Sequence, residues 1–195
     1  MIKQNYNLMM KQQISNLKGK PKLLLHVCCA PCSSGVLPKL KEYFDITLFY
    51  YNPNTYPKDE YLLRAEQFSK FCDLPLIVYD YEHNEFLSEI KGLEQLKEGG
   101  YRCQKCIELR MYKSFEYALN HNFDYVTTTL SVSPHKDAEF INICGQKLEE
   151  EYNVKYLYAD FKKENGYLNS ISESKKFDLY RQDYCGCEFS MHSNN

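Results

Sequence analysis

The sequence lacks the features that mark several large classes of protein. It has no tryptophan among its 195 residues and no run of apolar residues as long as a membrane-crossing helix, which needs about 18. Its first 20 residues contain no apolar core of the kind found in secretory signals. We therefore expect a cytoplasmic protein that makes no contact with a membrane.

Nucleotide-binding loops are also missing. Neither GxGxxG nor GxxxxGK(S/T) occurs in the sequence, so a dinucleotide fingerprint and a Walker phosphate loop are both excluded. The loop after the first predicted strand does not read SGGxDS, as in ATP pyrophosphatases, but CAPCSSG. Nucleotide hydrolysis is therefore not expected.

The overall composition is that of a packed globular protein. Apolar residues make up 44% of the chain and charged residues 26%, with a formal net charge of −2. The charge is uneven, because residues 1–22 carry five lysines and no acid. We predict a basic N-terminal arm over 1–22 and one α/β domain over 23–195. The arm either grips phosphates or is a solvated chain end, and the charge pattern alone leaves both open.

Short apolar runs alternate with helical stretches along the chain. Strands are predicted at 22–28, 45–51, 74–79, 124–129 and 154–158, and the main helices at 58–71, 104–121 and 137–152. This alternation is typical of a parallel sheet covered by helices on both faces. Because such folds place their sites at the carboxyl ends of the strands, the residues that follow the first and fourth strands become candidates.

Cysteine is the most informative residue in the chain. In a reducing compartment, nine cysteines indicate metal ligands or redox groups rather than structural disulfides. Seven of them fall in three tight groups: Cys28, Cys29 and Cys32; Cys103 and Cys106; Cys185 and Cys187. The isolated Cys72 and Cys144 are interpreted as core residues, because a free cysteine packs as a small hydrophobe.

Each cysteine group suggests its own chemistry. The pair Cys103-x-x-Cys106 with two thiolates of the first group would supply four sulfur ligands, which suit either zinc or an iron–sulfur cluster. Spacing does not separate these metals, but a position at the mouth of the sheet favours a working cluster. Cys185-Gly186-Cys187 is interpreted as a redox-active pair, since a disulfide across one residue is strained and easily reduced. Metal ligation is the rival interpretation.

Four segments together resemble the QueH family of epoxyqueuosine reductases. They are HVCCAPCSSG (26–35), EGGYRCQKCIELR (98–110), TTLSVSPHKD (128–137) and YRQDYCGCEFS (180–190). The resemblance implies a Rossmann-like fold similar to the adenine nucleotide α-hydrolase (HUP) group. It also implies an oxidoreductase that removes the epoxide oxygen of epoxyqueuosine at the tRNA wobble position, giving queuosine.

The resemblance further implies a [4Fe–4S] cluster and its ligands. Carried onto this sequence, the cluster ligands are Cys28, Cys29, Cys103 and Cys106, and the redox-active pair is Cys185 and Cys187. A second, mononuclear iron beside the cluster, or zinc in a purified sample, would have Cys32 as a candidate ligand. Expected partners are an external electron donor and the tRNAs with GUN anticodons (Tyr, His, Asn and Asp).

Residues near the cysteine groups and strand ends are candidates for contact with tRNA. Cations and hydroxyls can bind phosphates, and an aromatic ring can stack on an unpaired base. These candidates are Arg102, Arg110, Ser131, Ser133, His135, Lys136, Arg181 and Tyr184.

Three other functions stay open at this point. A cluster-dependent tRNA thiolase would share a similar fold, but it would need ATP, and the missing phosphate loop argues against it. A zinc-stabilised RNA-binding module would bind zinc without sulfide. A general thiol–disulfide oxidoreductase would use Cys103 and Cys106 without any metal.

Overall fold

The apolar run that begins at Lys22 forms the central strand of a parallel sheet. The computed structural model describes residues 4–191. Within them, five strands lie in the order β3-β2-β1-β4-β5, and each pairing is parallel. Their bounds are β1 Lys22–His26, β2 Asp45–Tyr50, β3 Leu76–Val78, β4 Tyr125–Thr128 and β5 Lys155–Tyr156. The predicted α/β fold is confirmed.

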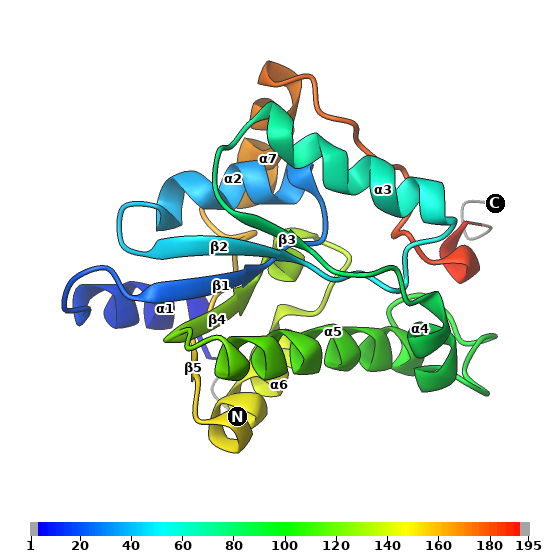
Figure 1. Cartoon of the computed structure of the whole chain (residues 1–195), viewed down its shortest axis with the longest axis horizontal. Helices are drawn as coiled ribbons and strands as arrows, with labels where there is room; N and C mark the ends of the chain where they lie inside the picture. Colours follow the sequence, from blue (N-terminus) through cyan, green and yellow to red (C-terminus); the bar gives the residue numbers. More distant parts are fainter. Residues whose placement is uncertain (1–3, 192–195) are drawn as a thin grey trace.

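Helices cover both faces of this sheet, as predicted (Figure 1). One face carries α2 (Ala30–Leu40), α3 (Lys58–Glu66) and α7 (Gly166–Lys176). The other carries α5 (Tyr101–Asn120) and α6 (Ala138–Tyr152), with the short α4 (His83–Glu89) packed near the start of α5. Short 3-10 turns follow α3, β4 and the C-terminal cysteines, at Gln67–Lys70, Thr129–Val132 and Glu188–Ser190.

Alternating side chains of β1 build a core on each face. Leu23 and Leu25 pack in the cluster that includes residues of α2, whereas Leu24 packs with residues of α5 and α6. Successive side chains of a strand point to opposite faces, so a strand covered on both sides reads as an unbroken apolar run. All three leucines are fully buried.

The register of the two central strands fixes where the site lies. His26, the last residue of β1, is paired with Thr128, the last residue of β4. The chain therefore leaves both strands at the same edge of the sheet. The crossovers from β1 and β4 run to opposite sides of this point, which makes it the topological switch of the fold, where open α/β sheets form their crevice.

The start of the chain contains a helix that the sequence analysis did not predict. The first turn of α1 (Tyr6–Ser15) is capped by Asn5, whose Oδ1 accepts a hydrogen bond of 3.1 Å from the Leu8 amide. Tyr6 and Met10 are buried, so this part of the predicted basic arm packs against the domain. Residues 1–3 of that arm and 192–195 of the predicted domain lie outside the described residues.

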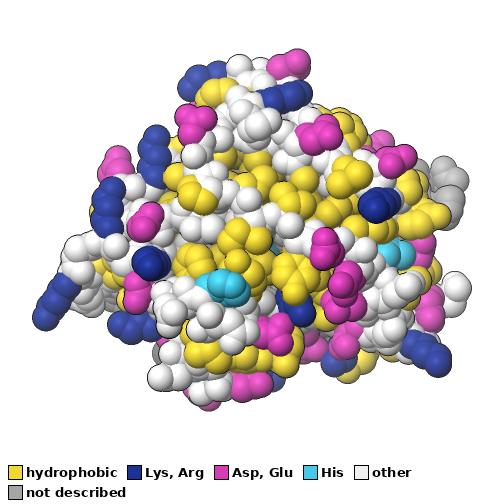
Figure 2. Space-filling view, viewed as in Figure 1, with side chains coloured by type: hydrophobic (Ala, Val, Ile, Leu, Met, Phe, Trp, Pro, Cys, Tyr) yellow, Lys and Arg dark blue, Asp and Glu magenta, His cyan; other side chains and the backbone are white. Residues whose placement is uncertain are grey.

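The surface carries charges of both signs. On the face shown in Figure 2, basic and acidic side chains are interspersed, with apolar side chains exposed between them. This face therefore carries no extended field of one sign. Within residues 4–191, no helix combines the length and the apolar character that a bilayer span requires.

Candidate metal and substrate site

The first cysteine group lies where β1 ends and α2 begins. Cys29 is the N-cap of α2, and Pro31 stands in the first turn, where its missing N–H is no loss. The Sγ atoms of Cys28, Cys29 and Cys32 all lie within 4.8 Å of one another, and those of Cys28 and Cys29 are 3.9 Å apart. Three thiols converge in this way above a helix N-terminus, which favours negative charge.

The three thiols share their protons unequally. The pKa of Cys28 is held well below its usual value, because the Cys29 and Cys32 thiols donate hydrogen bonds to its sulfur. Serving as donor raises the pKa of Cys29 to about 11 and also raises that of Cys32. Cys28 is therefore the thiol of the triad that loses its proton most easily, and a metal bound by all three sulfurs would have to displace their protons.

The second and third cysteine groups lie together. Cys103 and Cys106 are in the first two turns of α5, and Cys187 packs with Cys106 against Phe86. Both pairs, including Cys185, line a narrow recess of about 100 Å³. Burial raises the pKa of Cys106 to about 12.

The Cys185-Gly186-Cys187 segment is fixed by backbone contacts to α3 and the loop before it. Arg64 Nη1 donates to the Cys185 carbonyl at 3.2 Å, and the Tyr56 amide donates to the Gly186 carbonyl at 2.9 Å. Arg64 is itself paired with Glu60, with 2.7 Å between Nε and Oε1. Gly186 has φ +123°, a conformation that L side chains rarely adopt.

A larger cavity of about 730 Å³ joins the groups. Cys28 and Cys32 line it, and Cys185 lines both the cavity and the narrow recess. All nine cysteines are free thiols. The seven cysteines of the three groups lie together at the carboxyl edge of the sheet. Their sulfur donors fit an iron–sulfur cluster or a thiolate-bound metal.

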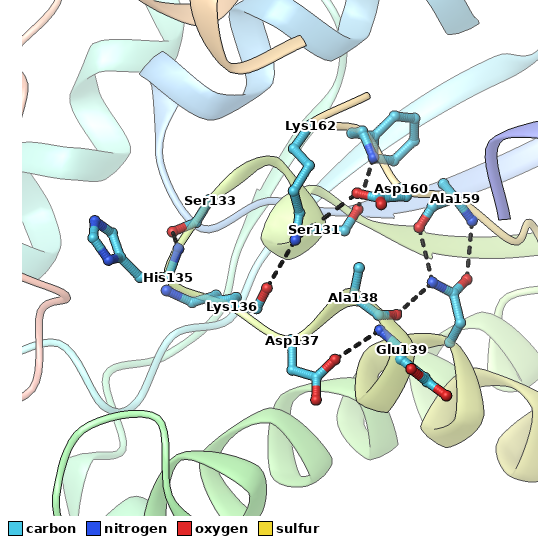
Figure 3. Close-up of polar contacts among 12 residues, drawn as sticks. Ser131, Ser133, His135, Lys136, Asp137, Ala138, Glu139, Ala159, Asp160 and Lys162 are labelled. Carbon is cyan, nitrogen blue, oxygen red and sulfur yellow. Dashed lines mark hydrogen bonds and ion pairs between the residues drawn. The ribbon is translucent and has the colours of Figure 1, made fainter. Parts of the chain in front are cut away.

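The loop after β4 brings polar groups to the rim of this cavity (Figure 3). Lys162 donates to the Lys136 carbonyl at 3.0 Å, and the Phe161 amide donates to Ser131 Oγ at 3.2 Å. Asp137 caps α6 through two backbone amides. These contacts fix the loop from behind, while the His135 side chain projects away from them. Lys136 Nζ lies 3.5 Å from Cys185 Sγ.

The predicted cluster ligands fall in two places. Cys28 and Cys29 lie with Cys32, whereas Cys103 and Cys106 lie with Cys185 and Cys187. His26, which precedes the triad, is a satisfied core residue: its two ring nitrogens bond Thr128 Oγ1 at 2.8 Å and the Tyr51 carbonyl at 3.1 Å.

The predicted tRNA contacts are also divided by their placement. Six of them line the large cavity: Arg110, Ser133, His135, Lys136, Arg181 and Tyr184. Arg102 lines the narrow recess instead, where it is 3% exposed, bonded to the Glu94 carbonyl and packed over the Phe189 ring. Ser131 is 1% exposed, and its hydroxyl holds the Phe161 amide.

Sequence reasoning missed part of the cavity wall. Asn52, Asn54 and Thr55, which follow β2, belong to this wall, and so do Arg64 and Gln182. The position of the first three after a strand of the predicted sheet was an available signal. Arg64 carries no such signal, since it lies within a helix 121 residues from its contact at Cys185.

The fold and the site together define a class. This is a Rossmann-like α/β protein that gathers cysteines around a crevice at the carboxyl edge of its sheet, as metal-dependent redox enzymes do. Comparison with known proteins narrows the class. The family model described as "Epoxyqueuosine reductase QueH" matches residues 23–193. The chain belongs to this family and is therefore an oxidoreductase of tRNA queuosine biosynthesis.

Individual relatives agree with this assignment. The epoxyqueuosine reductase QueH of Streptococcus pyogenes serotype M1 is 38% identical over 198 residues, which cover 95% of this chain and 78% of that protein. The Staphylococcus epidermidis QueH is 40% identical over 200 residues, covering 95% and 84% of the two chains.

A solved structure matches the fold at low identity. The U34-tRNA thiolase NcsA from Methanococcus maripaludis, with its [4Fe–4S] cluster, has a TM-score of 0.57 and 13% identity, over 95% of this chain and 67% of that one. At this identity the likeness concerns the fold alone, and it agrees with the predicted Rossmann-like α/β fold.

Proposed function

We propose that the large cavity receives the modified wobble nucleoside of tRNA and that the surrounding cysteines hold the centre that reduces it. The observation that carries this proposal is the shared lining: Cys28, Cys32 and Cys185 face the same cavity as the polar loop after β4. A nucleoside bound there would lie against sulfur donors on one side and hydrogen-bonding side chains on the other.

For the metal, the proposal assigns the cysteines as the resemblance to the QueH family implies. Cys28, Cys29, Cys103 and Cys106 hold a [4Fe–4S] cluster, and Cys32 contributes to a second, mononuclear iron, or zinc in a purified sample. Such a centre supplies electrons one at a time and a Lewis acid for the epoxide oxygen. The overall reaction takes up two electrons and two protons, forms the carbon–carbon double bond and releases the oxygen as water.

Residues of the chain itself can carry the electrons and protons that the reaction consumes. Cys185 and Cys187 can form a disulfide and release two electrons and two protons, so they can relay reducing equivalents from an external donor. Arg64 and Tyr56 hold the backbone of this pair in place. Lys136 Nζ lies 3.5 Å from Cys185 Sγ and donates a hydrogen bond to this sulfur.

The tRNA is bound at the rim of the cavity. His135 and Arg181 are exposed there and are suited to phosphate contact, and Tyr184 offers a ring for stacking on a splayed base. Ser133 adds a hydroxyl on the same loop as His135. The expected substrates are tRNAs with GUN anticodons, namely those for Tyr, His, Asn and Asp.

The first experiment is to measure iron, acid-labile sulfide and zinc per chain after anaerobic purification. About four irons with matching sulfide are expected, and any further iron marks the second metal. The preparation should then convert epoxyqueuosine in tRNA when a reductant is supplied. Zinc alone, without sulfide even after reconstitution, would refute the proposal and favour the zinc-stabilised RNA-binding module.

Single variants test the ligand assignment. Cys103→Ala and Cys106→Ala should abolish the cluster, whereas Cys32→Ala should keep four irons and lose only the additional metal. Cys144→Ala is the matched control, because this buried cysteine lies away from the cavity in the core between α5 and α6. A cluster that survives in Cys103→Ala but is lost in Cys32→Ala would instead assign it to the triad.

A further inference from the structure

The site contains positive charges that form no ion pair, although Glu98, Asp137 and Asp183 also line the narrow recess or the large cavity. Within residues 4–191, eight ion pairs have an N···O distance of 4.0 Å or less, and neither Arg110 nor Lys136 takes part in any of them. Arg64, another buried cation at the cavity, is balanced by Glu60. Of the four cations that line the large cavity, Arg64 alone has a carboxylate partner. The exposed Arg181 bonds the Ser170 carbonyl and Ser174 Oγ instead, whereas Arg110 and Lys136 lie deeper in the site.

Arg110 is the more deeply placed of the two. It stands one helical turn after Cys106 on α5 and is only 3% exposed. Its Nε donates to the Cys106 carbonyl at 3.0 Å, and its Nη1 donates to Asn52 Oδ1 at 3.4 Å. These neutral acceptors position the guanidinium without neutralising it. A buried charge is costly unless an anion compensates it, so a stable fold implies an anion close by.

The cysteine groups are the groups that can become this anion. Arg110 lines both the narrow recess, with Cys103 and Cys106, and the large cavity, with Cys28. Burial lowers the pKa of Arg110, but the negative charge that the neighbouring cysteine sulfurs carry once deprotonated, that of Cys106 first, raises it overall. Arg110 therefore stands between the two places where the proposed ligands lie.

Lys136 repeats this arrangement at the third cysteine group. Its Nζ lies 3.5 Å from Cys185 Sγ, and its backbone carbonyl is fixed by Lys162 at 3.0 Å. Lys136 also lines the large cavity together with Cys28 and Cys32, so its charge faces two of the proposed metal ligands as well. The loop after β4 thus holds a cation against a sulfur atom.

We propose that Arg110 and Lys136 are the fixed counter-charges of the metal–thiolate centre and that Arg110 raises its reduction potential. The inference rests on the proposed function, because it requires that the cysteines hold a redox-active metal. Each electron added makes the centre more negative, and a fixed positive charge nearby stabilises the reduced form more than the oxidised form. Both residues act on the centre and are positioning residues rather than catalytic ones.

The test is an anaerobic redox titration followed by electron paramagnetic resonance, on preparations with matched iron and sulfide. Arg110→Met should lower the midpoint potential by at least the equivalent of a tenfold change in the reduction equilibrium, which is 59 mV for one electron. Arg110→Lys keeps the charge and should shift the potential less. Lys113→Met, on the same helix, is the control and should shift it much less, because Lys113 stands seven residues beyond Cys106, pairs with Glu116 and is not among the lining residues of the recess or the cavity.

Further outcomes separate this inference from the proposed function. If Arg110→Met fails to fold, Lys136→Met should shift the potential in the same direction. An unchanged potential with full iron in both variants refutes the inference alone, and weaker tRNA binding at that unchanged potential would assign the charges to phosphate. A wild-type chain without iron and sulfide refutes the proposed function itself.

Discussion

Replacing Gly186 by alanine tests how the C-terminal cysteine pair is held. At φ +123°, a Cβ on Gly186 would lie 2.8 Å from Arg64 Nη1. Arg64 cannot move away freely, because the same guanidinium is bonded to the Cys185 carbonyl at 3.2 Å and to Glu60 at 2.7 Å. The substitution therefore strains the backbone and displaces a buried charged group at the same time.

These two effects can be separated by a matched control. Gly92 also has a positive φ, +82°, but a Cβ there meets nothing within 4 Å. Gly92→Ala should cost about 1–2 kcal/mol of backbone strain alone. Gly186→Ala adds the loss of a hydrogen bond from a charged donor, about 1.5–3 kcal/mol. We therefore expect Gly186→Ala to be the more destabilising variant by about 2 kcal/mol.

Urea unfolding under anaerobic conditions measures this difference as a shift in midpoint at constant slope. If the segment detaches locally instead, alkylation of Cys187, which is 6% exposed, should become faster in Gly186→Ala but not in Gly92→Ala. Equal stability and equal alkylation rates in the two variants would show that the contact with Arg64 does not hold the pair.

Three other predictions concern the relay, pH and packing. Cys185→Ser and Cys187→Ser should keep most of the iron but lose turnover of epoxyqueuosine in tRNA, and loss of the iron would make the pair ligands instead. Burial is the main reason why the pKa of His26 falls from 6.5 to about 4 in the folded protein. As the pH is lowered, the unfolded chain therefore takes up a proton at His26 before the folded protein does. Stability should fall by about 3 kcal/mol as pH drops from 6.5 towards 4, and His26→Gln should lack this component in urea titrations across that range. Gly145→Ala should lower the melting temperature measured by calorimetry, because the new Cβ would lie 2.4 Å from the Tyr156 ring. Overpacking of this kind costs about 1–3 kcal/mol. An unchanged melting temperature would show that the Tyr156 ring can move aside.

The sheet and the location of the site could be predicted because both depend on local patterns. An apolar run such as that of β1 needs cover on two faces, and parallel strands end at one edge whatever joins them. The positions of Cys28 and His135 after their strands therefore placed both residues at one cavity, and the structure confirms this. The pairing of the Cys103 group with the Cys185 group could not be predicted, because it depends on how the C-terminal segment folds back.

The missed features depend on contacts between distant segments. Arg64 is part of a largely polar helix, yet it is only 3% exposed, and it contacts the Cys185 carbonyl and the Tyr184 ring of the C-terminal segment. The N-terminal helix has a weak apolar face, with Tyr6 and Met10 as its buried residues. Lys11, predicted as part of a basic arm, is engaged in an ion pair with Glu164.

Gln13 of the N-terminal helix has a consequence for how copies of this protein meet. Its side-chain amide donates to the Tyr156 carbonyl at 2.8 Å and accepts from the Tyr158 amide at 2.9 Å. It therefore bonds the backbone at the end of β5, an edge strand of the sheet, and of the segment directly after it. Open strand edges are templates for pairing with another chain. By occupying these groups, one glutamine on a helix protects the molecule against intermolecular strand addition, and removing the helix should make the protein prone to aggregate.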